Sequence, residues 1–103
     1  MLNQIVMVGR IVKDVELVKG EDGKSYTNMT LGVPRSYKNA DGVYETDFIP
    51  CVLWNGIAEN VAEYCKKGDL VGVKGRIQSD EDGSIKVIAE KVTFLSTAKK
   101  EEE

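Results

Sequence analysis

Histidine is absent from this sequence, and cysteine occurs only twice. Without imidazole the chain lacks the commonest general base of enzymes, and two thiols alone cannot complete a tetrahedral zinc site. No nucleophile–base pair and no phosphate-cradling glycine loop is apparent. We therefore expect a protein that is not an enzyme and that has neither a metal nor another cofactor. We expect both thiols, Cys51 and Cys65, to be reduced and mostly buried.

Long apolar runs are also missing, since none approaches the roughly 18 residues that a membrane span needs. The first residues have neither a basic region nor a small-residue cleavage site, so we expect no signal peptide and a cytoplasmic protein. With 103 residues, 42% of them hydrophobic and 30% charged, the composition is typical of one soluble globular domain.

An excess of basic residues, which is frequent in nucleic-acid-binding domains, is absent too, because the formal net charge is −3. The acidic residues are unevenly placed, however. Six of the 17 lie in the turn Asp80–Asp82 and at the C-terminus, Glu101–Glu103. We expect both segments to be solvated and away from the body of the domain, so the total charge does not exclude a local positive surface.

Apolar and β-branched runs separated by Gly and Asp turns predict five strands. Their expected ranges are Asn3–Ile11, Ser25–Arg35, Asp47–Trp54, Leu70–Ser79 and Ile85–Leu95. The first strand could continue through Lys13–Val18 after a kink. Pro34 should end the second strand or lie at a sheet edge, and residues 37–44 are expected to form a loop with an Asp-Gly turn.

A short helix is predicted between the third and fourth strands by apolar residues four apart, at Ile57, Val61 and Cys65. Asn55 is a plausible N-cap, Lys66 and Lys67 suit the negative end of the helix dipole, and Gly68 suits a left-handed C-cap. Three strands, a helix and two strands follow the order of an all-β OB-fold, a five-stranded Greek-key barrel. Several small α+β folds share that order.

The third strand carries two large rings on one face. Residues two apart share a face, so one face holds Phe48, Pro50, Val52 and Trp54, and the other holds Ile49, Cys51 and Leu53. One face suffices for a core. The ring-bearing face is either a second core or a platform for flat groups, and a base that stacks on an aromatic gains about 1–3 kcal/mol.

Cations are expected near these rings. Lys74 and Arg76 share the non-core face of the fourth strand, and Arg10 lies at the end of the first. Arg35 and Lys38 flank Tyr37. Taken singly, each ring could be core and each cation an ordinary solvated charge, as we expect of Phe94 in the core and of Tyr26, Tyr44 and Tyr64 as structural residues. Their joint placement favours single-stranded nucleic acid, whose phosphates need cations and whose bases stack.

Several segments match one family in order and spacing: Leu2–Arg10, Thr30–Val33, Arg35–Tyr37, Thr46–Trp54, Ala58–Tyr64, Lys67–Gly68, Val73–Arg76 and Val92–Leu95. Through them the sequence resembles the bacterial and phage single-stranded DNA-binding proteins over residues 1–96. The resemblance implies a cytosolic OB-fold that assembles into oligomers, usually homotetramers, and wraps single-stranded DNA without sequence preference in replication, recombination or repair. It places stacking aromatics at Tyr37, Phe48 and Trp54, a cation at Lys38, and basic positions at Arg10, Arg35 and Arg76.

The sequence departs from the family pattern in three places. The turn between the fourth and fifth strands, Asp80–Ser84, is short and acidic, which predicts a smaller footprint and weaker binding. Pro50 removes a polar or basic position between the rings. The expected tail, residues 97–103, has acid but no apolar tip, so recruitment of partner proteins through it is doubtful. A short tail fits a phage or mobile-element protein, or a trimmed chain.

Two alternatives remain beside single-stranded DNA binding: an OB-fold replication adaptor, primosome-like, with secondary nucleic-acid binding, and an RNA-binding OB protein. Self-association is expected in any case, as a tetramer rather than a dimer. The first strand reads as a barrel edge with apolar side chains, and unpaired edges seek partners. Its expected interface, paired about a two-fold axis, comprises Gln4, Ile5, Val6, Met7 and Val8.

Overall fold

The computed structural model describes residues 1–97 and contains six strands and one helix. The strands are β1 (Ile5–Ile11), β2 (Val18–Lys19), β3 (Ser25–Lys38), β4 (Tyr44–Trp54), β5 (Leu70–Ser79) and β6 (Ile85–Ser96), and helix α1 (Asn55–Tyr64) connects β4 to β5. Within the described residues, no helix is long and apolar enough to cross a membrane.

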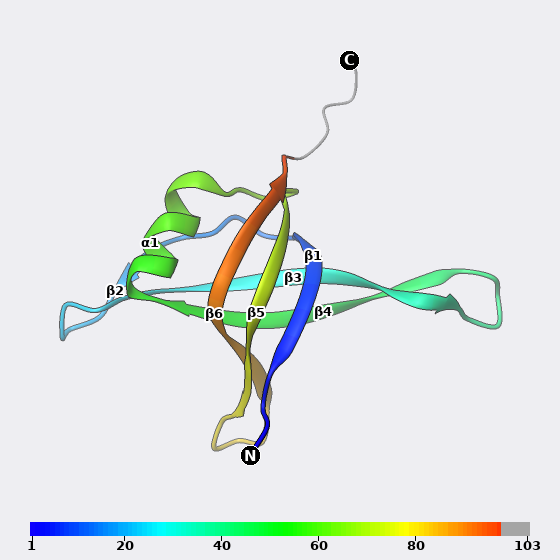
Figure 1. Cartoon of the computed structure of the whole chain (residues 1–103), viewed down its shortest axis with the longest axis horizontal. Coiled ribbons are helices and arrows are strands. Elements are labelled where there is room, and N and C mark those ends of the chain that lie inside the picture. The colour runs from blue at the N-terminus through cyan, green and yellow to red at the C-terminus, as the bar shows by residue number, and fades with distance from the viewer. Residues whose placement is uncertain (98–103) are drawn as a thin grey trace.

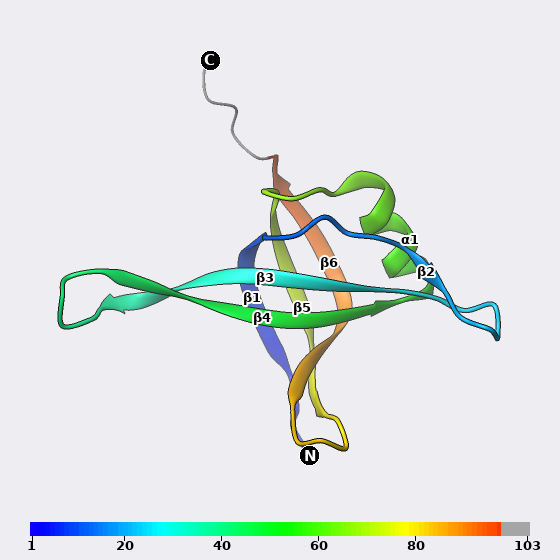
Figure 2. The ribbon, with the colours of Figure 1, turned by 180° about the vertical axis from the view of Figure 1, so that it is seen from behind.

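The five long strands close into a barrel. The sheet order is β1-β5-β6-β4-β3-β2, and a further pairing of β1 with β3 completes the ring. In Figure 1, β1, β5 and β6 cross in front of β3 and β4, and Figure 2 shows the β3–β4 layer from behind. These observations confirm the predicted all-β OB-fold with one short helix. The two-residue β2 is an addition at the edge of β3.

The core fills the space between these layers and beneath α1. Its most buried side chains are those of Ile11, Met29, Leu31, Leu53, Val71 and Val73, joined by Ala58 and Val61 of the helix. Cys51 is buried and Cys65 is half-buried, and both thiols are free. Burial raises the pKa of the Cys51 thiol to about 12, so this thiol is protonated at neutral pH.

β3 and β4 continue beyond the barrel as a hairpin, which we call the arm (residues 34–47) and which projects clear of the barrel in Figure 1. The predicted loop with its Asp-Gly turn is present but shorter than residues 37–44, because pairing continues to Lys38 and Tyr44. Asn39 closes a tight turn, where its Oδ1 accepts bonds from the amides of Asp41 and Val43 at 2.9 and 3.0 Å. Pro34 pairs with Thr46 inside the ladder rather than ending β3, beside a register shift.

The predicted helix caps were also wrong. Trp54 is the N-cap, without a side-chain hydrogen bond, and Asn55 is the first helical residue with φ 54°. The helix ends at Tyr64, which leaves Lys66 and Lys67 beyond it. Gly68, with φ 96°, belongs instead to the turn into β5, where its N–H donates to the Ile11 carbonyl at 2.7 Å.

Two further expectations fail at the ends of strands. Lys13–Val18 does not continue β1, because the chain leaves the sheet after Ile11 and only Val18 and Lys19 pair again. Phe94 is 47% exposed rather than core. It lies near the C-terminal end of β6, where it lines a shallow groove with Tyr64 at the end of α1, so no second layer covers it.

Closure of the barrel requires a glycine at position 75. A Cβ built there would lie 2.1 Å from the Ile88 carbonyl oxygen and 3.2 Å from the Ala89 Cα, at a register shift between β5 and β6. Both neighbours are backbone atoms, which cannot move aside without distorting the strand pairing.

We predict that Gly75→Ala lowers the free energy of unfolding by about 1–3 kcal/mol, as overpacked core positions do. The matched control is Gly56→Ala in α1, where an added Cβ meets nothing within 4 Å, and where alanine raises stability by up to about 1 kcal/mol. Urea denaturation followed by circular dichroism measures both variants. Equal stability of Gly75→Ala and the wild type would contradict the close approach.

Candidate nucleic-acid interface

The outward face of β4 exposes its two rings, although Val52 on the same face is only 7% exposed. Phe48 is 62% exposed and Trp54 is 43% exposed, whereas Cys51 and Leu53 on the inward face are 1% and 0% exposed. This resolves the choice between core and platform that the alternation left open. The two rings are six residues apart on one strand, which corresponds to roughly 20 Å. Pro50, also exposed, lies between them.

Trp54 is held from one side by Tyr26. The two residues are direct partners in the β3–β4 register, and their ring centroids are 5.3 Å apart with the planes tilted by 42°. The remaining indole surface faces a groove that Lys24, Glu21 and Asp22 also line. Tyr26 was predicted to be structural, and its contact with Trp54 was missed because strand register is not visible in one sequence.

Phe48 and Arg10 lie in one row across the barrel. Arg10 pairs with Gly32, and Gly32 pairs with Phe48. Strands are about 4.8 Å apart, so the two backbones are separated by roughly 10 Å. Because Gly32 has no side chain, a groove of about 480 Å³ opens over it.

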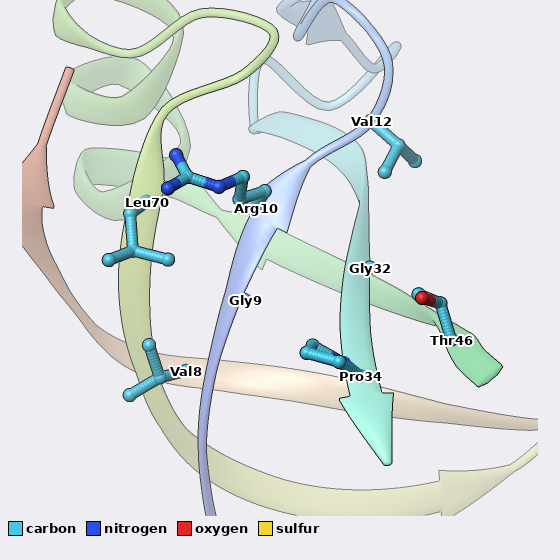
Figure 3. Close-up of a pocket in the computed structure, with 8 residues that line it drawn as sticks. All are labelled: Val8, Gly9, Arg10, Val12, Gly32, Pro34, Thr46 and Leu70. Carbon is cyan, nitrogen blue, oxygen red and sulfur yellow. The ribbon is translucent and has the colours of Figure 1, made fainter. Parts of the chain in front are cut away.

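Figure 3 shows the lining of this groove, which is mostly apolar: Val8, Gly9, Val12, Gly32, Pro34 and Leu70, with Arg10 and Thr46 as the polar members. The guanidinium of Arg10 turns toward Leu70, and Pro34 and Thr46 lie on the other side of the groove. Arg10 Nη1 donates a hydrogen bond to the Gly68 carbonyl at 3.0 Å. A Cβ on Gly32 would lie 3.1 Å from Val12, 3.4 Å from Thr46 and 3.7 Å from the Phe48 ring. The glycine therefore keeps the groove open, and an isolated glycine inside a predicted strand was the available signal.

The two cations of β5 face different parts of the surface. Arg76 pairs with Ile88, which pairs with Val52 of β4, so Arg76 belongs to the surface that carries Trp54. Its Nε lies 3.5 Å from Glu90 Oε2, and its Nη1 donates to Gln78. Lys74 lies instead between Val6 of β1 and Lys91 of β6. The structure thus brings Arg10 and Arg76 near the rings and places Lys74 on the β1 side.

Both cations of the arm already have partners within the chain. Arg35 forms ion pairs with Glu45 and Asp47 at 2.9 and 2.8 Å, and Lys38 Nζ lies 5.6 Å from the centre of the Tyr44 ring. Tyr37 is 63% exposed on the same hairpin. The arm therefore presents an open ring and two engaged cations.

The predicted self-association strand has an open edge. β1 pairs with β5 from Ile5 to Arg10, but along its other edge the described structure pairs only Arg10 and Ile11, with β3. Val6 and Val8 point outward and are 72% and 48% exposed, and Leu95 of β6 is 47% exposed on the same face. Gln4 is exposed, whereas Ile5 and Met7 are half-buried toward the core.

Among residues 1–97, no group of three or more His, Cys, Asp or Glu side chains is placed to hold a metal ion. The surface instead offers separated rings, an apolar groove and scattered cations. Such a surface can bind a flexible polymer that carries flat groups and negative charges.

Comparison with known proteins gives a consistent result. The model of the single-strand binding protein family matches residues 2–95. The chain is 43% identical to single-stranded DNA-binding protein B of Bacillus subtilis (strain 168), over 98% of this chain and 96% of that protein. It is 47% identical to a single-stranded DNA-binding protein of Halalkalibacterium halodurans, over 92% of this chain and 61% of that protein.

The fold has a solved counterpart in the crystal structure of the wild-type single-stranded DNA-binding protein from Thermus aquaticus. The TM-score is 0.76 at 24% sequence identity, and the similarity covers 99% of this chain and 44% of that chain. This similarity concerns the fold alone. The family match confirms the resemblance found in the sequence and agrees with the prediction that the chain is not an enzyme. The chain belongs to the single-strand binding protein family.

Proposed function

We propose that this protein binds single-stranded DNA without sequence preference and protects it during replication, recombination or repair. The observation that carries the proposal is the pair of exposed rings, Phe48 and Trp54, on the outward face of a strand whose other face is core. A solvent-exposed tryptophan and phenylalanine on a regular strand gain free energy when bases cover them. The names of the relatives support the same function, and nothing in the comparisons favours the primosome-like adaptor.

The proposed path of the strand follows the outward face of β3 and β4. Bases stack on Trp54 and Phe48 and then on Tyr37 of the arm. Phosphates are neutralised by Arg10 and Arg76 beside the rings, with Lys38 and Lys74 as the further predicted contacts. The groove over Gly32 has room beside Phe48 for the edge of a base or a sugar. We propose residues 1–96 as the binding domain and the cytoplasm as the location of the protein.

The short β5–β6 hairpin adds no ring to this path. Its turn carries Asp80, Glu81 and Asp82, and Lys86 there is paired with Asp80 at 2.9 Å. We therefore keep the expectation of a smaller footprint per protomer. The segment on which the predicted tail function depends lies almost wholly in residues 98–103, outside the described residues. A phage or mobile-element origin stays a prediction.

Trp54 is the only tryptophan, so its fluorescence reports one position. We predict strong quenching when a dT oligomer is titrated at low salt, and weaker quenching at high salt, because each neutralised phosphate contributes about −0.7 to the slope of log K against log[salt]. An RNA oligomer of equal length serves as competitor and measures the preference for deoxyribose. Unchanged fluorescence in the folded protein would refute a base on Trp54.

Truncation of either ring should weaken binding. We predict that Trp54→Ala and Phe48→Ala each cost about 1–3 kcal/mol of binding free energy, because each removes one stacked base. Tyr64→Ala is the matched control, since Tyr64 is 70% exposed but lies at the end of α1. Fluorescence anisotropy of a labelled dT oligomer gives the affinities, and thermal melting checks the fold. Equal affinities of all three variants would contradict the platform.

We also propose that the protein forms a homotetramer through the β1 face. An open strand edge beside exposed Val6 and Val8 supports this assembly, because pairing with a second copy would satisfy the edge and cover the valines.

For this assembly we predict a mass near four times the 11.4 kDa protomer in multi-angle light scattering. Val6→Asp should shift the mass toward smaller species, because it places a charge on the covered face. Ile85→Asp is the control, since Ile85 is 59% exposed at the start of β6. A wild-type protein at protomer mass would refute self-association.

A further inference from the structure

Arg35 stands at the centre of a polar network in the arm. Its Nε and Nη2 donate to the Asp47 carboxylate at 3.1 and 2.8 Å, and its Nη1 donates to Glu45 Oε1 at 2.9 Å. Paired, planar donors of this kind form the strongest hydrogen bonds between side chains. All three nitrogens of the guanidinium thus donate to two carboxylates on β4, the opposite strand of the hairpin.

The same network extends to the turn of the arm. Glu45 Oε2 accepts a bond from Asn39 Nδ2 at 2.9 Å, and the other side-chain atom of Asn39 closes the turn through Asp41 and Val43. Glu45 is therefore held in place on both of its oxygens. An approaching phosphate would have to displace carboxylates that are already positioned, rather than mobile side chains.

Charge reinforces this competition. One guanidinium and two carboxylates give this network a formal charge of −1. The hydrogen bond from Arg35 lowers the pKa of Asp47, which favours the ionised carboxylate. Lys38, the other arm cation, faces the Tyr44 ring. The Tyr37 ring is thus open to a base, while the charge of the network disfavours phosphate.

We propose that Glu45 and Asp47 act as an internal competitor that holds Arg35 away from DNA phosphates, so that the arm binds by stacking and adds little to the salt dependence. This inference rests on the proposed single-stranded DNA binding and replaces the direct phosphate contact predicted for Arg35. It assigns the salt-dependent part of binding to the cations of the barrel, Arg10 and Arg76 among them. Binding strength is then limited by two acidic residues that never touch DNA.

The test removes the competitor and keeps the cation. In Glu45→Gln/Asp47→Asn, Arg35 gains access to a phosphate, so we expect at least fivefold tighter binding to a dT oligomer at low salt. The slope of log K against log[salt] should steepen by about 0.7, the value for one added phosphate contact. The control, Glu63→Lys, changes the net charge by the same two units at one exposed position on α1. We expect it to change affinity less than twofold and to leave the slope unchanged.

Arg35→Gln completes the cycle. In the wild-type background it should leave the salt slope unchanged, and in the Glu45→Gln/Asp47→Asn background it should abolish the gain. Circular dichroism and melting temperature verify the fold of each variant, and Asp47→Asn alone replaces the double variant if that one melts early.

Three outcomes would overturn the inference while leaving the proposed function intact. Arg35→Gln alone could reduce the slope by about 0.7, which would show a phosphate contact in the wild type. Glu63→Lys could tighten binding as much as Glu45→Gln/Asp47→Asn, which would show an effect of net charge. A folded Glu45→Gln/Asp47→Asn variant could bind more weakly, which would show that the acids only shape the arm. A wild-type protein that fails to bind dT would overturn the proposed function and this inference with it.

Discussion

The close approach of backbones at glycines is the constraint on which this barrel depends. Five strands enclose a small core, and at Gly75 the Ile88 carbonyl occupies the space where a side chain would begin. At the β1–β3 closure, the Gly32 carbonyl lies 2.8 Å from where a Cβ of Gly9 would be. The same closure brings Arg10 within two strands of Phe48. The geometry that permits a barrel of this size therefore also assembles a cation, a groove and a ring on its outside.

Much of the fold could be predicted from the sequence, because the alternation of side chains along a strand is a local property. β5 has the predicted limits, and Leu53 is buried while Phe48 is exposed as parity requires, although Val52 on the face of Phe48 is buried too. The failures share a different origin. Gly68 was predicted to be the left-handed C-cap of the helix, whereas its positive φ belongs to a turn that is fixed by a hydrogen bond to Ile11, far away in sequence. Such long-range contacts leave no periodic trace.

The candidate site shows the same division between local and distant information. The rings were found from the pattern, but Arg35 could not be seen as engaged, because its carboxylate partners are ten and twelve residues away on the next strand. The register of strand pairing also places Lys74 beside Val6 and Arg76 beside Ile88, although the two cations are neighbours on one face of β5. A sequence supplies the chemical groups of a surface, whereas pairing decides which of them act together.

The open edge of β1 has a consequence for how this sequence can change. An unpaired edge flanked by exposed valines is also the feature that lets unrelated chains add on and aggregate. A protomer released from the proposed assembly would expose this edge, so pairing with a second copy would also protect the protein from aggregation. A substitution at Val6 or Val8 would therefore affect two properties. One is the fit to another copy in the proposed assembly, and the other is the tendency of a newly synthesised protomer to aggregate before it meets that copy.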